Sequence, residues 1–350
     1  MLSNLAHKCH GHANSEGFDM SVYASKRYDP TRTTNLRNSF ARDMNRRFSK
    51  LVTIINKAIM DEDCFAIKPG SGGFATMADM VTPGRLAFDF PRSGDKVTAF
   101  MEWLRKQVDA GILEVGRFPR LGTAIEEMWT DQYIYSAYQK GIARARQELM
   151  GAGYAVPSLE ESGGLDAAFN MPMHLDRVGL IYSRVYSELK GITSAMDTQI
   201  SRVLAQGMAD GRGPIELARL LTKTITGPFG DLSITDTLGR FIPARRRAEM
   251  LARTEIIRAH HVATIQEYKN WAVEGVKVRA EWQTAGTGAC SRCLDLEGKV
   301  FELNVIEAMI PFHPNCRCVA LPVEARRGRK VEISSKEAVW TRELTKGTES

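Results

Sequence analysis

Apolar residues recur at three- and four-residue spacing along most of the chain, and this spacing predicts amphipathic helices. Two of these helices are expected to begin at Pro214 and Pro243. Backbone N–H groups in the first turn of a helix have no partner within the helix, so a proline, which lacks this group, is tolerated there. Gly111 and Gly151 stand where two others are expected to end. The predicted helices cover residues 35–59, 93–111, 123–151, 175–209, 214–221 and 243–273.

The pattern changes beyond Gly275, where Val276, Val278, Ala280 and Trp282 alternate with polar residues as in a half-buried strand. Further short strands are expected at residues 299–303 and 318–323, and residues 151–164 are expected to form a linker. The fold class is therefore mainly α with a small α+β C-terminal module. The predicted regions are a flexible arm (1–30), a helical region (31–155), a long-helix region (166–275), a β module (276–323) and a mobile charged tail (324–350).

The composition is that of an ordinary globular protein, with 43% hydrophobic and 25% charged residues. These values argue against wholesale disorder and against a coiled-coil rod. No apolar run approaches the ~18 residues that a membrane helix needs, and residues 1–10 show no apolar stretch typical of a signal peptide. We therefore expect a protein made in a reducing compartment, without a membrane partner.

Positive charge is concentrated in the first predicted helix. Residues 26–57 hold nine Lys or Arg against two Asp, a local balance of +7, whereas the whole chain carries +6. A local basic patch favours a specific acidic partner, which is either DNA or an acidic protein surface. The candidate contact residues lie off the apolar stripe of this helix and are Arg37, Arg42, Arg46, Arg47 and Lys50.

Four of the six cysteines fall close together near the end of the chain, where they form the string C-x2-C-x19-H-x2-C-x-C. Two short knuckles of thiol and imidazole donors are a common way to hold zinc tetrahedrally. The candidate ligands are Cys290, Cys293, His313, Cys316 and Cys318.

Five candidates compete for four positions, and two arrangements stay open. If Cys316 and Cys318 share one strand, the site has four cysteines and His313 lies outside it. If His313 and Cys316 share a turn, Cys318 is the spare. Buried structural thiols and a disulfide are the alternatives to a metal. A structural zinc that staples the module is expected rather than a catalytic one, because no H-x-E motif supplies a general acid/base.

The motifs of the C-terminal third occur in a familiar order. Ala-Arg-Thr-Glu, with Arg253 and Glu255, precedes Glu-Trp at Trp282, the C-x2-C knuckle and His-Pro-Asn-Cys-Arg-Cys. Over about residues 176–323 the sequence resembles the phage Mu F-like head morphogenesis family, the minor capsid proteins of tailed bacteriophages. One departure is the lack of a carboxylate before the first cysteine, since residues 284–289 contain only small side chains.

The resemblance implies a virion protein inside the head near the portal, which is present in the host cytoplasm during assembly. It would contact the portal and other head proteins and act in assembly, DNA packaging or DNA release, without an enzymatic activity. Glu255 and Arg258 are expected to form a surface ion pair, Trp282 a core aromatic, and Gly298 a tight turn.

Two other functions remain open from the sequence. One is a zinc-dependent hydrolase or nuclease that uses His313 and Glu255, although no second carboxylate lies near the knuckles. The other is an accessory protein that binds DNA non-specifically through the basic helix, in a salt-dependent manner.

Overall fold

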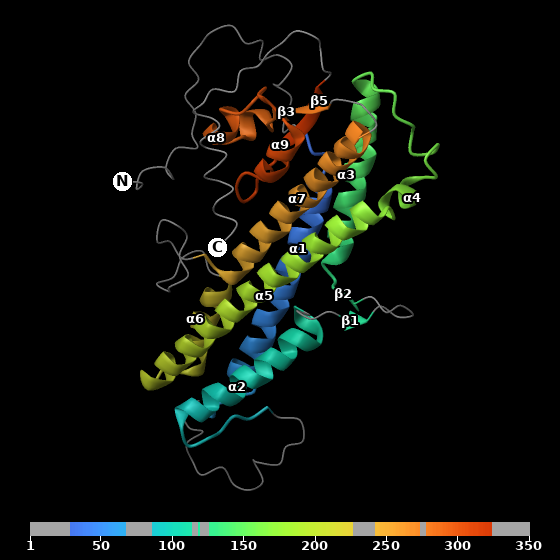
Figure 1. Cartoon of the computed structure of the whole chain (residues 1–350). Coiled ribbons are helices and arrows are strands. Elements are labelled where there is room, and N and C mark those ends of the chain that lie inside the picture. The colour runs from blue at the N-terminus through green and yellow to red at the C-terminus, as the bar shows by residue number, and fades with distance from the viewer. Residues whose placement is uncertain are drawn as a thin grey trace. The chain divides into compact units, whose positions relative to one another are not determined.

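A computed structural model describes residues 29–67, 86–113, 118–119, 126–226, 242–273 and 278–323. The expected arm up to residue 28 and the charged tail 324–350 lie outside these residues. Helices dominate, and a small antiparallel sheet lies near the end of the chain, as the sequence predicts (Figure 1). None of the described helices is both long and apolar enough to cross a membrane.

The chain forms two compact units. The described residues of the first unit lie within 37–132 and 182–253. The described residues of the second unit lie within 29–36, 133–181 and 254–323. These units differ from the three regions predicted for residues 31–323, because helices α5 (Pro172–Ala209) and α7 (Ala244–Val273) each run from one unit into the other.

The first unit is helical. Helix α1 (Thr34–Asn56) continues into a π-helical turn (Lys57–Asp61), against which α6 (Pro214–Thr226) packs. Along α1 the apolar stripe is buried, with Phe40, Phe48 and Leu51 fully enclosed, which explains why this segment is helical in the protein. Helix α2 is Ser93–Gln107, and a two-stranded ladder joins β1 (Phe118–Pro119) to β2 (Glu126–Glu127).

The helix predicted over residues 93–111 differs from the structure at its end. Helix α2 begins at Ser93, with Arg92 as its N-cap, and continues past Gln107 as a π-helical turn to Ile112. Gly111 lies inside that turn with φ of 152°, which a glycine adopts without the strain of a side chain.

The second unit contains α3 (Asp131–Gly151), the short α4 (Leu165–Phe169) and the C-terminal sheet. The expected start of α3 near residue 123 is wrong, because residues 126–127 form β2 and a turn leads into Asp131. Helix α4 was not predicted, and it lies after a segment that the sequence indicated only as a linker.

The sheet has the strand order β4-β3-β5 and is antiparallel throughout. Strand β3 (Arg279–Gln283) shows the predicted alternation, with Ala280 and Trp282 buried. Strand β5 is Val319–Val323, close to its prediction. Strand β4 is only Val300–Phe301, because the chain turns at Leu303 into a helix, α9 (Leu303–Met309), that the sequence did not indicate.

The C-terminal sheet shares one hydrophobic core with α3 and α7. Leu149, Ile257 and Tyr268 of these helices pack in the same cluster as Trp282 and Ile306. Helices α3 and α7 approach closely, since a Cβ added to Gly141 would lie 2.3 Å from the carbonyl oxygen of His260. The β-containing segment is therefore packed on helices of its own unit rather than around a core of its own.

Candidate metal centre

The C-x2-C knuckle is built on a short helix, α8 (Ser291–Leu294). Cys290 is its N-cap, and the carbonyl of Cys290 accepts the backbone N–H groups of Cys293 and Leu294, each at 3.0 Å. This single helical turn brings residues three apart to the same side. It therefore aims the sulfurs of Cys290 and Cys293 at one place.

The second knuckle is a turn. The backbone N–H of Cys316 donates to the carbonyl of His313 at 3.0 Å, and Asn315 has φ of 61°, a left-handed conformation that asparagine tolerates. The N–H of Asn315 donates to Oγ1 of Thr254 in α7 at 3.0 Å. Thr254 of the Ala-Arg-Thr-Glu motif thus anchors the turn of the His-Pro-Asn-Cys-Arg-Cys motif.

All five predicted donors come together. Nε2 of His313 lies 3.3 Å from Sγ of Cys290 and 3.2 Å from Sγ of Cys293. These three donor atoms lie within 4.8 Å of one another, and so do the sulfurs of Cys293, Cys316 and Cys318. Zinc with bonds of ~2.3 Å to sulfur and ~2.0 Å to nitrogen separates its tetrahedral donors by roughly 3.5–3.8 Å. The cluster therefore fits a zinc ion, with Cys293 common to both groups.

The tautomer of His313 suits a ligand. Nδ1 lies 2.9 Å from the carbonyl oxygen of Pro314. A carbonyl only accepts, so Nδ1 carries the proton and the neutral ring presents the lone pair of Nε2 to the sulfurs of Cys290 and Cys293. Metal-binding histidines are commonly fixed in this way by a backbone carbonyl.

The three buried thiols ionise as a coupled group. Hydrogen bonds from Cys293 and Cys318 lower the pKa of the Cys316 thiol, and backbone N–H groups of Cys318 and Phe312 add to this effect. Hydrogen bonds to Cys316 and Cys318, together with burial, raise the pKa of Cys293. The hydrogen bond from Cys293 lowers the pKa of Cys318, but the bond to Cys316 and burial outweigh it, so this pKa is raised. Negative charge is therefore best accommodated on Cys316.

Trp282 lies behind the cysteines as a fully buried aromatic, as predicted. Its ring meets those of Phe301 and Phe312 edge-on, with centroids 6.5 and 5.8 Å apart. The indole N–H has no regular hydrogen-bond acceptor among the described residues, and it acts on the sulfur of Cys318, whose pKa it lowers. An N–H group directed at a cysteine sulfur favours the thiolate form that a metal requires.

The sequence left two arrangements of the five donors open, and the structure agrees with neither in full. His313 and Cys316 do share a turn, but Cys318 stays with the cluster. Cys316 and Cys318 both precede β5, so they do not share a strand. Gly298 has φ of 73° in the turn before β4, as expected of a glycine there.

The ion pair predicted between Glu255 and Arg258 on α7 is present, but its carboxylate is not at the surface as predicted. Arg258 does bind Glu255, with Nε 3.1 Å from Oε2, but the Glu255 side chain is only 2% exposed. Ile256 and Ile257 are buried as well, so α7 is enclosed on several faces at this turn. Arg253, in the same helix, is half-buried.

The basic face of α1 is smaller than predicted. Arg37 is only 7% exposed, so it does not belong to a solvent-facing patch. Arg47 stacks on Trp129, with its guanidinium carbon 4.0 Å from the ring centroid, and its Nη1 donates to the carbonyl of Ile112 at 3.1 Å. Long arginine stems bury readily against aromatic rings, and the 3.6-residue period alone does not show this.

The other three basic residues of that face are exposed. Arg42 donates to the hydroxyl of Ser39, Arg46 pairs with Asp43, and Lys50 donates to the carbonyl of Gly111. Arg42, Arg46 and Lys50 therefore remain as the candidate contact surface of α1.

Sequence reasoning missed a buried ionic network in the second unit. Glu267 accepts from Nε of Arg146 at 3.0 Å, and its other oxygen lies 2.9 Å from Nε2 of His174. Tyr138 completes the chain through Nδ1 of His174 at 3.0 Å. Burial alone would raise the pKa of Glu267, but the hydrogen bond to His174 and the charge of Arg146 lower it overall. These residues are far apart in sequence, so no local motif reveals them.

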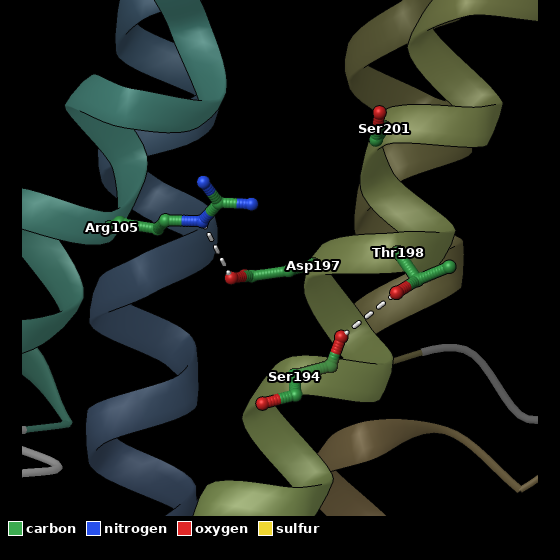
Figure 2. A pocket seen from close by; sticks show the side chains of 5 residues that line it. All are labelled: Arg105, Ser194, Asp197, Thr198 and Ser201. Atoms are coloured by element: carbon green, nitrogen blue, oxygen red, sulfur yellow. Dashed lines mark hydrogen bonds and ion pairs between the residues drawn. The ribbon is translucent and has the colours of Figure 1, made fainter. Parts of the chain in front are cut away.

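The first unit has a polar pocket of about 480 Å³ between α2 and α5. Figure 2 shows Arg105 of α2 facing Asp197 of α5, with Nε 3.3 Å from Oδ2, beside Ser194, Thr198 and Ser201. Burial raises the pKa of Asp197 more than Arg105 lowers it. No site residue predicted from the sequence lines this pocket.

The chain was compared with protein families, curated proteins and solved structures. Residues 198–321 match the family described as phage Mu protein F like protein. No curated protein and no solved structure matches the chain. The matched segment contains all five donors of the cysteine–histidine cluster together with Thr254, to which the second knuckle is anchored. Over residues 198–321, the chain is therefore similar to the phage Mu protein F-like family.

Proposed function

We propose that the protein is a minor capsid protein that acts in head morphogenesis of a tailed bacteriophage. The observation that carries this proposal is the family match over residues 198–321, which suggests a head morphogenesis protein located in the virion. Its place is inside the head near the portal, where it acts in assembly, DNA packaging or DNA release.

The cysteine–histidine cluster serves this function as a structural zinc site. Its donors outnumber the four positions of tetrahedral zinc, so the ion is closed off by protein, as in structural sites. When bound, the ion ties α8 to the turn at His313–Cys316. That turn is held on α7 through Thr254, so the metal stabilises the packing of the sheet on the helices.

Contact with other head proteins is assigned to the exposed basic residues of α1. Arg42, Arg46 and Lys50 can meet an acidic protein surface or DNA phosphates, since point charges discriminate weakly between carboxylate and phosphate. The apolar stripe of α1 offers nothing further to a partner, because Phe40, Phe48 and Ile55 are buried within the protein itself. We assign the portal as the main partner and packaged DNA as a secondary, non-specific one.

The test uses the phage or prophage that encodes the chain. Purified particles are examined by mass spectrometry with a copy count, and lysates of a deletion strain by electron microscopy. The expected result is a few copies per particle and defective or empty heads after deletion. Absence from particles together with normal heads would contradict the proposal.

A second arm of the test identifies the partner. A variant with Arg42, Arg46 and Lys50 changed to Glu is compared with one in which Arg202 and Arg219, exposed on α5 and α6, are changed to Glu. Reduced incorporation of the first variant alone into procapsids assembled without DNA indicates a protein partner. A defect that begins only with packaging indicates DNA. Nuclease or hydrolase activity that a chelator abolishes would instead favour a zinc enzyme.

A further inference from the structure

The cluster has one donor more than a tetrahedral ion accepts, and the structure separates the five into an inner and an outer set. Residues Cys293, Cys316 and Cys318 are 1%, 1% and 2% exposed, and their sulfurs lie within 4.8 Å of one another. Cys290 and His313 are only half-buried. Both sets belong to the structural zinc site proposed above, and their roles as ligands rest on that site.

The inner sulfurs have the surroundings of bound thiolates. Backbone N–H groups of Cys318 and Phe312 donate to the sulfur of Cys316. The Trp282 indole N–H is buried, has no hydrogen-bond partner among the described residues, and lies close enough to Cys318 to lower the pKa of its thiol. A neutral thiol is a weak acceptor, whereas a thiolate is a strong one. The N–H group of Trp282 is therefore satisfied when Cys318 is a ligand and left without a good acceptor when Cys318 is spare.

The outer donors occupy neighbouring places beside Cys293. Sγ of Cys290 and Nε2 of His313 are 3.3 Å apart, and Nε2 is 3.2 Å from Sγ of Cys293. They come from separate local elements, the N-cap of α8 and the turn at residues 313–316. Both donor atoms lie within 4.8 Å of the sulfur of Cys293. With three positions taken by the inner sulfurs, only one of the two donors can bind at a time.

We propose that Cys293, Cys316 and Cys318 are constant ligands of the metal ion and that Cys290 and His313 alternate in the fourth position. The site then has a sulfur-only form and a form with one nitrogen. The fourth position is the exchangeable one, because the donor that leaves it is half-exposed to solvent. Loss of either outer donor leaves a complete set of four ligands, whereas loss of an inner thiolate does not.

The test uses the full chain and Co²⁺, whose visible d–d bands report tetrahedral coordination and shift with the number of sulfur ligands. The variants are Cys290→Ala, His313→Ala, the double variant of both, and Cys318→Ala. Each single outer variant is expected to bind one Co²⁺ tetrahedrally with affinity within about tenfold of the unchanged chain, and with opposite shifts of the bands. The double variant and Cys318→Ala are expected to lose about 100-fold or more in affinity.

X-ray absorption of the unchanged zinc-loaded chain gives a second measure that needs no variant. The proposal predicts an average of between three and four sulfur ligands. An average of four, or of three or fewer, would overturn the alternation. Strong binding by Cys318→Ala alongside loss of binding by either outer variant would also overturn it and make Cys318 the spare. An unchanged chain that takes up neither Zn²⁺ nor Co²⁺ would instead refute the metal centre itself.

Discussion

The close approach of α3 and α7 at Gly141 gives the most specific prediction about stability. A Cβ at this position would lie 2.3 Å from the carbonyl oxygen of His260 and 2.7 Å from Cβ of Ala263. Ordinary contact begins near 3.4 Å, so the two helices would have to separate by 1.1 Å (3.4 − 2.3) or distort. Neither obstacle is the end of a flexible side chain, and the strain therefore falls on the backbone.

Two terms of opposite sign set the effect of Gly141→Ala. Alanine in a helix interior gains about 1 kcal/mol over glycine, whereas overpacking of a well-packed contact costs roughly 1–3 kcal/mol. Gly179→Ala in α5 is a matched control, because a Cβ there meets nothing within 4 Å. The helix-propensity term cancels between the two variants. Gly141→Ala should therefore have a free energy of unfolding about 1–3 kcal/mol below that of Gly179→Ala.

The assay is urea unfolding of both variants and of the unchanged chain, followed by circular dichroism. Gly179→Ala should be equally stable or slightly more stable than the unchanged chain, and Gly141→Ala less stable than the control. If both substitutions raise the unfolding midpoint equally, the helices do not approach as closely as the structure shows, and the reasoning is refuted.

Two further predictions concern buried charge. Burial lowers the pKa of His260 to about 3 and of His261 to about 4, so the unfolded chain, with values near 6.5, binds protons that the folded chain does not. The contribution of these two histidines to stability should therefore be complete above pH 6.5 and fall as the pH is lowered toward 4. The loss is at most about 1.4 kcal/mol per pH unit for each histidine. A urea midpoint that is unchanged between pH 7 and pH 5 would argue against this. Replacing Glu267 with Leu leaves Arg146 buried without its carboxylate partner and should cost about 3–5 kcal/mol of stability. The control Glu188→Leu removes the half-exposed pair with Arg184 and should cost less than about 1 kcal/mol. Similar losses in thermal melts of the two variants would contradict the role of the network.

The sequence predicts most helices and the donors of the metal centre because these depend on local pattern. The period of three to four residues locates α1 and α5, and Pro214 begins α6 as expected. The knuckle spacing identifies all five donors, since each pair is brought together by a single turn.

What the sequence does not show depends on contacts between distant segments. The stacking of Arg47 on Trp129 and the buried pair of Arg146 with Glu267 join residues that no spacing relates. Helix α9 was not predicted, because its seven residues are too few for a helical period to be visible. The structure, and not the spacing, distinguishes inner from outer donors, because that distinction depends on burial and on Trp282.

Metal analysis of the purified chain, prepared without chelators, tests the central claim most directly. Five donors gathered around Cys293, with His313 in the tautomer that presents Nε2, predict about one zinc per chain. The zinc should remain through gel filtration and be released by a strong chelator with loss of stability of the second unit. A zinc content near zero in protein that is folded and reduced would contradict the account.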